Sequence, residues 1–114
     1  MILKKNNNYM KKTTKFNDYL IGSLKNKKEA SAYLNVALEE YKKDNDTEAF
    51  LLALRDVAEA QGGLSQLAEK TNLNRQNLYK ALSGKGNPQF VTLGAILDGL
   101  GFNLSIKPVI HQST

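Results

Sequence analysis

The chain has 114 residues and carries 16 Lys and Arg against 11 Asp and Glu, a formal net charge of +5. That length suits one domain, and 41% hydrophobic residues with 8% aromatic residues and no Trp favour a compact helical domain over a large β-sandwich or α/β enzyme. The absence of Cys and the single His, His111, exclude disulfides, thiolate metal sites, cysteine nucleophiles and any His-based zinc site or catalytic triad in the body of the domain. We therefore expect no enzyme activity, no metal and no cofactor.

The charge is unevenly spread along the chain. Residues 1–28 hold eight Lys and one Asp, residues 29–62 hold three basic and eight acidic groups, and residues 63–114 hold five basic and two acidic groups. The two basic blocks favour a polyanionic partner, whereas the acidic block favours a surface that avoids DNA or meets a basic protein. No apolar run approaches the roughly 20 residues that span a bilayer, and no secretory signal is apparent, so we expect a cytoplasmic protein.

The N-terminal part of the chain gives the weakest structural signal. Residues 1–15, rich in Asn and Lys, are expected to form a disordered leader in which Met10 is an alternative start. Two interpretations of this leader stay open: a solvated tail, or a basic arm that contacts DNA phosphates. Between Phe16 and Ile21, three large apolar groups precede Gly22, which predicts an extended segment or short turn that lies on the domain.

Two amphipathic helices are predicted next. The first covers residues 27–43, with Asn26 as N-cap and Glu29 at the capping-box position. The second covers residues 47–61, with Asp46 as N-cap and a pair of glycines after its end. In both segments the apolar residues recur at the i, i+3, i+4, i+7 spacing of one helical face, so each helix should cover a core.

A helix-turn-helix pattern occupies residues 64–82, with its second helix at residues 75–82. This motif needs a small residue where its two helices touch and a residue tolerant of left-handed geometry in the turn. Ala68 and Asn72 fill these two positions, and Asn74 is then the N-cap of the second helix.

A last helix and a short strand complete the prediction. The helix begins near Phe90, and Gly101 ends it. Leu104–Ile106 alternates in the manner of a β-strand, and because a lone strand is unstable, it should either pair with its twofold mate in a dimer or pack on the helices. The predicted fold is all-α: five helices over residues 16–108 with an N-terminal helical extension and a short C-terminal β-strand, followed by a tail at 109–114.

The helix-turn-helix predicts which side chains meet DNA, because the first turn of its second helix enters the major groove. Arg can bond guanine, and Gln or Asn can bond adenine. The residues expected to read bases are Asn74, Arg75, Gln76, Tyr79 and Lys80. The residues expected to contact phosphates are Gln66, Ser83, Lys85 and Asn87. For Tyr79, half-buried packing on the domain is an equal alternative to a DNA contact. For Lys80, the alternative is a solvated surface charge.

The run from Phe50 to Ile106, and especially its string LYKALSGKGNPQF, resembles the antidote proteins of HigA-like toxin–antitoxin modules, within the Cro and lambda-repressor helix-turn-helix superfamily. Residues 16–41 are also similar to the N-terminal part of that family. The main departure is Asn72, where such families usually have Gly. Asn is the residue next most tolerant of left-handed geometry, so the departure is mild.

The resemblance implies an antitoxin that binds a RelE/ParE-like toxin and, as a homodimer, represses their shared operon on double-stranded operator DNA. Toxins of that type are usually small and basic, so the acidic helices offer a complementary surface. The residues expected in that toxin-binding surface are Glu29, Glu39, Glu40, Asp44, Asp46 and Glu48. A solvated helical face is the alternative for each of them singly. The alternative function is a stand-alone prophage transcriptional repressor of the Cro type, without a toxin partner.

Overall fold

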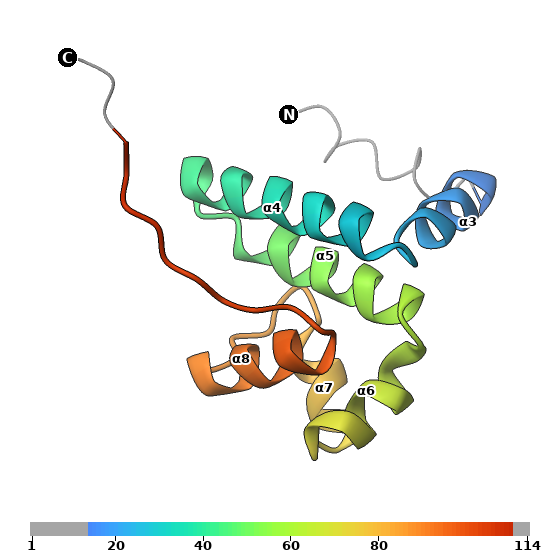
Figure 1. The fold of residues 1–114 in the computed structure, drawn as a ribbon. Coiled ribbons are helices and arrows are strands. Elements are labelled where there is room, and N and C mark those ends of the chain that lie inside the picture. Colours follow the sequence, from blue (N-terminus) through green and yellow to red (C-terminus); the bar gives the residue numbers. More distant parts are fainter. Residues whose placement is uncertain (1–13, 111–114) are drawn as a thin grey trace.

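The computed structural model describes residues 14–110, which form six helices and no strand (Figure 1). The helices are α3 (Thr14–Ser23), α4 (Lys27–Asp44), α5 (Thr47–Ala60), α6 (Gly63–Thr71), α7 (Arg75–Ala81) and α8 (Phe90–Gly99). In Figure 1, α5 lies between α4 on one side and α6, α7 and α8 on the other. The all-α class is confirmed: the structure adds α3 to the five helices expected after residue 26, and the described residues form no C-terminal strand.

The additional helix, α3, replaces the extended segment expected between Phe16 and Ile21. Leu20 and Leu24 are four residues apart, so a helix turns both toward α5, and Leu24 is 1% exposed. Gly22 lies inside α3 rather than ending it. Of the apolar groups expected to lie on the domain, Leu20 packs against the core whereas Tyr19 is exposed.

The caps predicted for the two long helices are formed. Asn26 Oδ1 accepts a hydrogen bond from Glu29 N at 3.0 Å, and Asp46 Oδ1 accepts one from Ala49 N at 3.1 Å. Asn45 ends α4 in the left-handed region at φ 57°. Each cap satisfies a backbone group that the helix leaves without a partner, and this is why the observed bounds of α4 and α5 lie close to the predicted ones.

A single core joins the N-terminal helices to α6, α7 and α8. Its largest fully buried side chains come from the α3–α4 turn, α5, the end of α7 and α8: Leu24, Leu51, Leu54, Val57, Leu78, Leu82 and Ile96. Polar contacts also connect the N-terminal part of the chain to the ends of α5 and α8. Gln61 Nε2 donates to the carbonyl oxygens of Leu24, at 2.7 Å, and Lys25, at 3.1 Å. Lys27 Nζ donates to the Leu100 carbonyl oxygen and lies 5.3 Å from the centroid of the Phe102 ring.

The chain after α8 differs from the prediction. Leu104–Ile106 forms no strand in the single chain, and pairing with a twofold mate stays a prediction. Leu104 is 53% exposed and lines a hollow with residues of α4 and α8, whereas Ile106 is 98% exposed, so only the leucine packs on the helices. The physical reason is the absence, within residues 14–110, of a strand edge that could satisfy the backbone of this segment.

Several predicted features lie outside the described residues: residues 1–13 of the leader with Met10, and residues 111–114 of the tail with His111. Thr14 and Lys15, which we assigned to the leader, begin α3.

Candidate nucleic-acid interface

The turn between α6 and α7 has the geometry that the sequence predicted. Asn72 adopts the left-handed conformation at φ 62°. Thr71 Oγ1 donates to the Leu67 carbonyl oxygen at 2.8 Å and accepts a hydrogen bond from Leu73 N at 3.3 Å. These bonds close the turn over the half-buried Ala68, so α7 leaves α6 in a fixed direction.

The first turn of α7 presents polar side chains to solvent. Asn74 Oδ1 accepts a hydrogen bond from Asn77 N at 2.7 Å, as an N-cap should. This leaves the amide nitrogen of Asn74 as its free donor. Arg75 and Gln76 are exposed beside the cap, whereas Leu78 is fully buried. The buried leucine fixes the rotation of the short helix, and therefore which side chains face outward.

Tyr79 links two arginines on this surface. The guanidinium carbon of Arg75 lies 5.4 Å from the centroid of the Tyr79 ring, and an Arg75 nitrogen donates to the Tyr79 hydroxyl at 3.4 Å. Arg55, on α5, lies at 5.4 Å from the same ring. Tyr79 is 37% exposed, so it both packs and remains accessible.

Arg55 is a residue that the sequence analysis missed. It belongs to the charge-mixed helix α5, which we assigned to the acidic block, and its proximity to α7 is a tertiary contact that residue spacing does not reveal. The sequence gives only a weak indication of this role: Arg55 is the one basic residue of α5.

The structure brings together three of the four residues expected to contact phosphates. Ser83, Lys85 and Asn87 line one shallow hollow together with Lys80 at the end of α7. Ser83 Oγ donates to the Lys80 carbonyl oxygen at 3.0 Å, which ties the loop to the helix. Gln66 is exposed on α6, and its side-chain amide lies over Gly62 instead.

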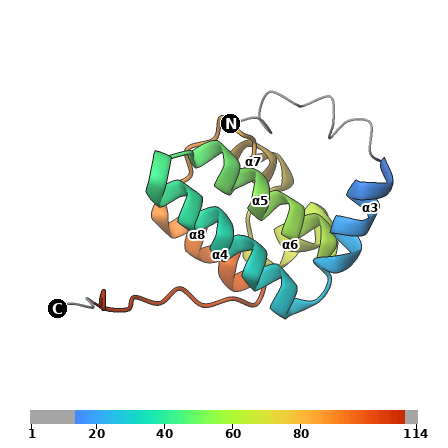
Figure 2. The same ribbon diagram turned by 90° about the horizontal axis from the view of Figure 1, so that it is seen from above.

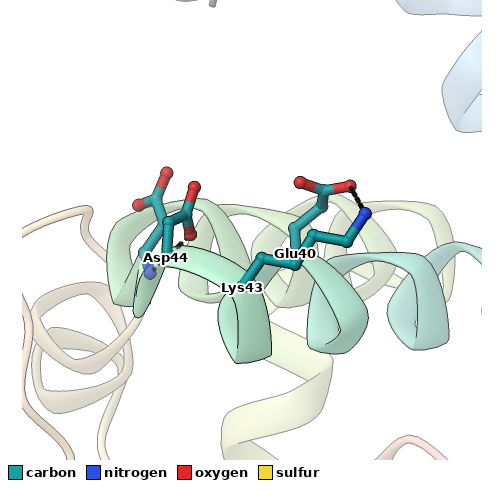
Figure 3. Close-up of polar contacts among 4 residues, drawn as sticks. Glu40, Lys43 and Asp44 are labelled. Carbon is teal, nitrogen blue, oxygen red and sulfur yellow. Dashed lines mark hydrogen bonds and ion pairs between the residues drawn. The ribbon is translucent and has the colours of Figure 1, made fainter.

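The acidic residues expected to bind a toxin lie along α4, in the turn that follows it and at the start of α5, and their role stays a prediction. On α4, Glu39 lies 3.8 Å from Lys42 and Glu40 lies 3.9 Å from Lys43, and Figure 3 shows the second pair. Both pairs are exposed. Glu29 is at the other end of α4, in its first turn.

The remaining acidic residues contact the local backbone. Asp44 Oδ1 accepts a hydrogen bond from Asp46 N at 3.0 Å, and Asp46 caps α5 (Figure 3). The Glu48 carboxylate lies beside Gly84, next to the loop that follows α7. Glu48 therefore contributes negative charge to the side of the molecule that carries the DNA-reading candidates.

A half-buried pair joins α4 to α5 beside Arg55. The Tyr33 hydroxyl donates to Asp56 Oδ2 at 2.7 Å. Burial raises the pKa of Asp56, and this effect outweighs the hydrogen bond from Tyr33 and the charge of Arg55, which lower it. Burial and the same hydrogen bond raise the pKa of Tyr33.

Residues 14–110 contain no group of three or more His, Cys, Asp or Glu that could hold a metal ion. Within the same range, no helix has the length and apolar character needed to cross a membrane.

Comparisons with known proteins place the chain in a family. The family described as "Probable addiction module antidote protein" matches residues 12–108. An uncharacterized protein of Haemophilus influenzae is 37% identical over 84 residues, which cover 74% of this chain and 81% of that protein. No solved structure matches. Because the family match spans most of the sequence, the chain belongs to the addiction module antidote family, in which an antitoxin acts against a partner toxin.

Proposed function

We propose that this antitoxin neutralises a RelE/ParE-like toxin by direct binding and, as a homodimer, represses its own operon through a HigA-like helix-turn-helix on operator DNA. It acts in the cytoplasm and carries out no catalysis. The observation that supports DNA binding best is the capped helix α7, which is held by the buried Leu78 and leaves Arg75 and Gln76 exposed in its first turn. Short helices held in this way by a preceding helix read the major groove with their first turn.

The two kinds of DNA contact come from different parts of this surface. Arg75 and Gln76 are suited to base edges, where a good bidentate pair is worth about 1–3 kcal/mol of discrimination. Lys80, Ser83, Lys85 and Asn87 share the hollow after α7 and are suited to phosphates, which fix orientation rather than sequence. Asn74 keeps its amide nitrogen available for either role.

The acidic helices support the toxin-binding part of the proposal. Glu39 and Glu40 pair with lysines only at the surface, and exposed ion pairs contribute about 0–1 kcal/mol. A basic partner can therefore replace Lys42 and Lys43 at little cost. The proposed contact is the exposed face of α4, with Glu29 at its start.

Gel-shift titration on the protein's own promoter tests DNA reading. Arg75→Ala and Gln76→Ala should each reduce the preference for the operator over unrelated DNA. Lys85→Ala should weaken binding to all sequences together and lower the salt dependence by about one phosphate contact. Unchanged sequence preference in both α7 variants would remove the assignment of α7 as the reading helix.

Co-expression tests toxin neutralisation. A neighbouring reading frame of toxin size should be lethal alone and harmless with this chain. The double charge reversal Glu39→Lys with Glu40→Lys should restore lethality, while Lys70→Glu on α6, a control outside the acidic face, should not. The absence of any toxic neighbour would favour the stand-alone Cro-type repressor.

A further inference from the structure

An uncharged apolar groove runs between α4, α5 and α8. It consists of two adjoining hollows of about 220 and 340 Å³ that share Leu38, Phe50 and Leu93. Leu104 lines one end and Tyr41 the other. Among the described residues, neither hollow is lined by a charged side chain or by any residue of α6 or α7. We call this the α4–α8 groove.

The segment after α8 carries a second unsatisfied apolar surface. Residues 103–110, which we call the arm, are extended and leave the helical body (Figures 1 and 2). Ile106 is 98% exposed and Ile110 82%, so neither side chain is covered by the described part of its own chain. Contiguous apolar surface of this kind marks an interaction site in a folded protein.

We propose that two copies of this chain exchange arms, each arm lying in the α4–α8 groove of the other copy. The inference rests on the homodimer of the proposed function and specifies where that dimer forms. A twofold contact is isologous, so one association covers both grooves and both arms. The arm also begins at the groove, because Leu104 lines it.

The charge of the groove distinguishes a second copy from the toxin as its occupant. A basic toxin gains most from acidic side chains, and the carboxylates of α4 that pair with Lys42 and Lys43 lie outside the lining of the groove. The arm, in contrast, offers aliphatic side chains at Leu104, Ile106, Val109 and Ile110, and its one charged side chain, Lys107, is exposed. No residue of α7 lines the groove, although Asn87, one of the proposed phosphate contacts, does.

The mass of the full chain in solution, measured without DNA, tests the proposal. The wild type should be a dimer, and Ile106→Asp should raise the dimer dissociation constant at least about tenfold, since a charge would enter an apolar groove. Ile106 has almost no contact within its own chain, so its substitution should leave the helical circular dichroism unchanged. The matched control is Val36→Asp, at an aliphatic residue of α4 that is 61% exposed and does not line the groove.

Cysteine cross-linking tests the exchange directly, because the chain has no Cys of its own. Asn35 is an exposed residue in the lining of the groove. Chains carrying Asn35→Cys, mixed with chains carrying Ile106→Cys and oxidised, should form disulfide-linked heterodimers. Mixing Val36→Cys with Ile106→Cys should give far fewer. A double variant, Asn35→Cys with Ile106→Cys, that closes its disulfide within one monomer would show the arm in its own groove and overturn the proposal.

Failure of this inference is distinguishable from failure of the proposed function. A dimer unaffected by Ile106→Asp would overturn arm exchange and leave the homodimer standing. A monomeric wild type would overturn both the exchange and the homodimer. Neither result changes the gel-shift outcome expected for Arg75→Ala and Gln76→Ala.

Discussion

Tyr79 connects α5 to the surface proposed to read DNA. Its ring lies against the guanidinium groups of Arg55 and Arg75, and planar guanidinium groups stack on aromatic rings as lysine ammonium groups do not. The ring limits the rotamers of Arg75, so less conformational entropy is lost when Arg75 bonds a base. Arg55 adds a further positive charge to the same surface.

Replacing Arg55 should therefore weaken DNA binding even though no motif marks it. Arg55→Ala should lower operator affinity roughly two- to fivefold, the effect of losing an exposed cation–π contact of about 0.5–1 kcal/mol. Arg55→Lys should recover only part of the loss. Fluorescence anisotropy with labelled operator measures both, and Lys42→Ala, a charge removed from α4, is the control. Equal effects of Arg55→Ala and Lys42→Ala would show that only net charge matters.

Asp56 gives the stability of the protein a defined dependence on pH. Because burial raises its pKa, the folded state keeps the Asp56 proton at a pH where the unfolded state has lost it. Protonation then favours folding, so the contribution of Asp56 to stability falls as the pH rises above the ordinary aspartate value of 3.8.

The variant Asp56→Asn isolates this effect, since its amide oxygen can still accept the Tyr33 hydrogen bond. The free energy of unfolding of the variant, minus that of the wild type, should increase as the pH rises from about 4 to 7. Urea unfolding followed by circular dichroism measures the difference, in which the titration of all other groups cancels. A difference that stays constant over this range would mean that the pKa of Asp56 is not raised.

At the scale of elements, the loop after α7 depends on close packing at one glycine. A methyl group added to Gly86 would overlap the backbone carbonyl oxygens of Lys80 and Ala81, which cannot move without disturbing the end of α7. At Gly84, an added methyl would meet only the flexible side chain of Glu48. Replacement by alanine should therefore be tolerated better at Gly84 than at Gly86.

Gly86→Ala should lower the free energy of unfolding by about 1–3 kcal/mol, the usual cost of overpacking, and should weaken operator binding by shifting Lys85 and Asn87. Gly84→Ala is the matched control and should have a clearly smaller effect on both. Urea unfolding and gel-shift titration give the two quantities. Similar losses in the two variants would contradict the assigned packing.

The success of prediction differs between elements for physical reasons. The bounds of α4, α5 and α7 were predictable because Asn26, Asp46 and Asn74 cap their own helices, and a cap is a local interaction. The helix α3 was not, because Gly22 resembles a terminator and the burial of Leu24 against α5 is a tertiary effect. The alternation at residues 104–106 indicates a strand only where another strand is available to pair with it.

At the scale of the whole molecule, the N-terminal helices and the helix-turn-helix share one core. Leu24 precedes α4 yet is fully buried, together with Leu54 of α5 and Ile96 of α8. The half that carries the proposed DNA-reading surface is therefore not an independent unit, and damage at the N-terminal end should reduce the stability of the whole domain.

Leu24→Ala should lower the free energy of unfolding by about 2–5 kcal/mol, the range for truncating a buried leucine. Unfolding should remain a single transition, because both halves of the domain share the core that the substitution weakens. Leu52→Ala, at a leucine of α5 that is 38% exposed, is the control and should cost much less. Separate transitions for the two halves would show that they fold independently.

The candidate site was predictable in its local part and not in its assembled part. Asn72, Asn74 and the outward residues of α7 follow from the motif. Arg55 reaches Tyr79 only through packing of α5 on the motif, and Asp44 and Asp46 accept hydrogen bonds at the turn between their helices. Residue spacing within one helix carries no information about either arrangement.

The contact of Lys27 with the end of α8 affects the energetics of the arm. The hydrogen bond from Lys27 to Leu100 and the cation–π contact with Phe102 anchor the chain immediately before residue 103. Gly101, at φ 89°, sets the direction in which the chain continues. A segment anchored and aimed at its root samples a small part of the space open to a free peptide, so docking it requires ordering only the residues that follow. The root of the arm is thus held by an amine that lies 73 residues earlier in the sequence than its hydrogen-bond partner Leu100.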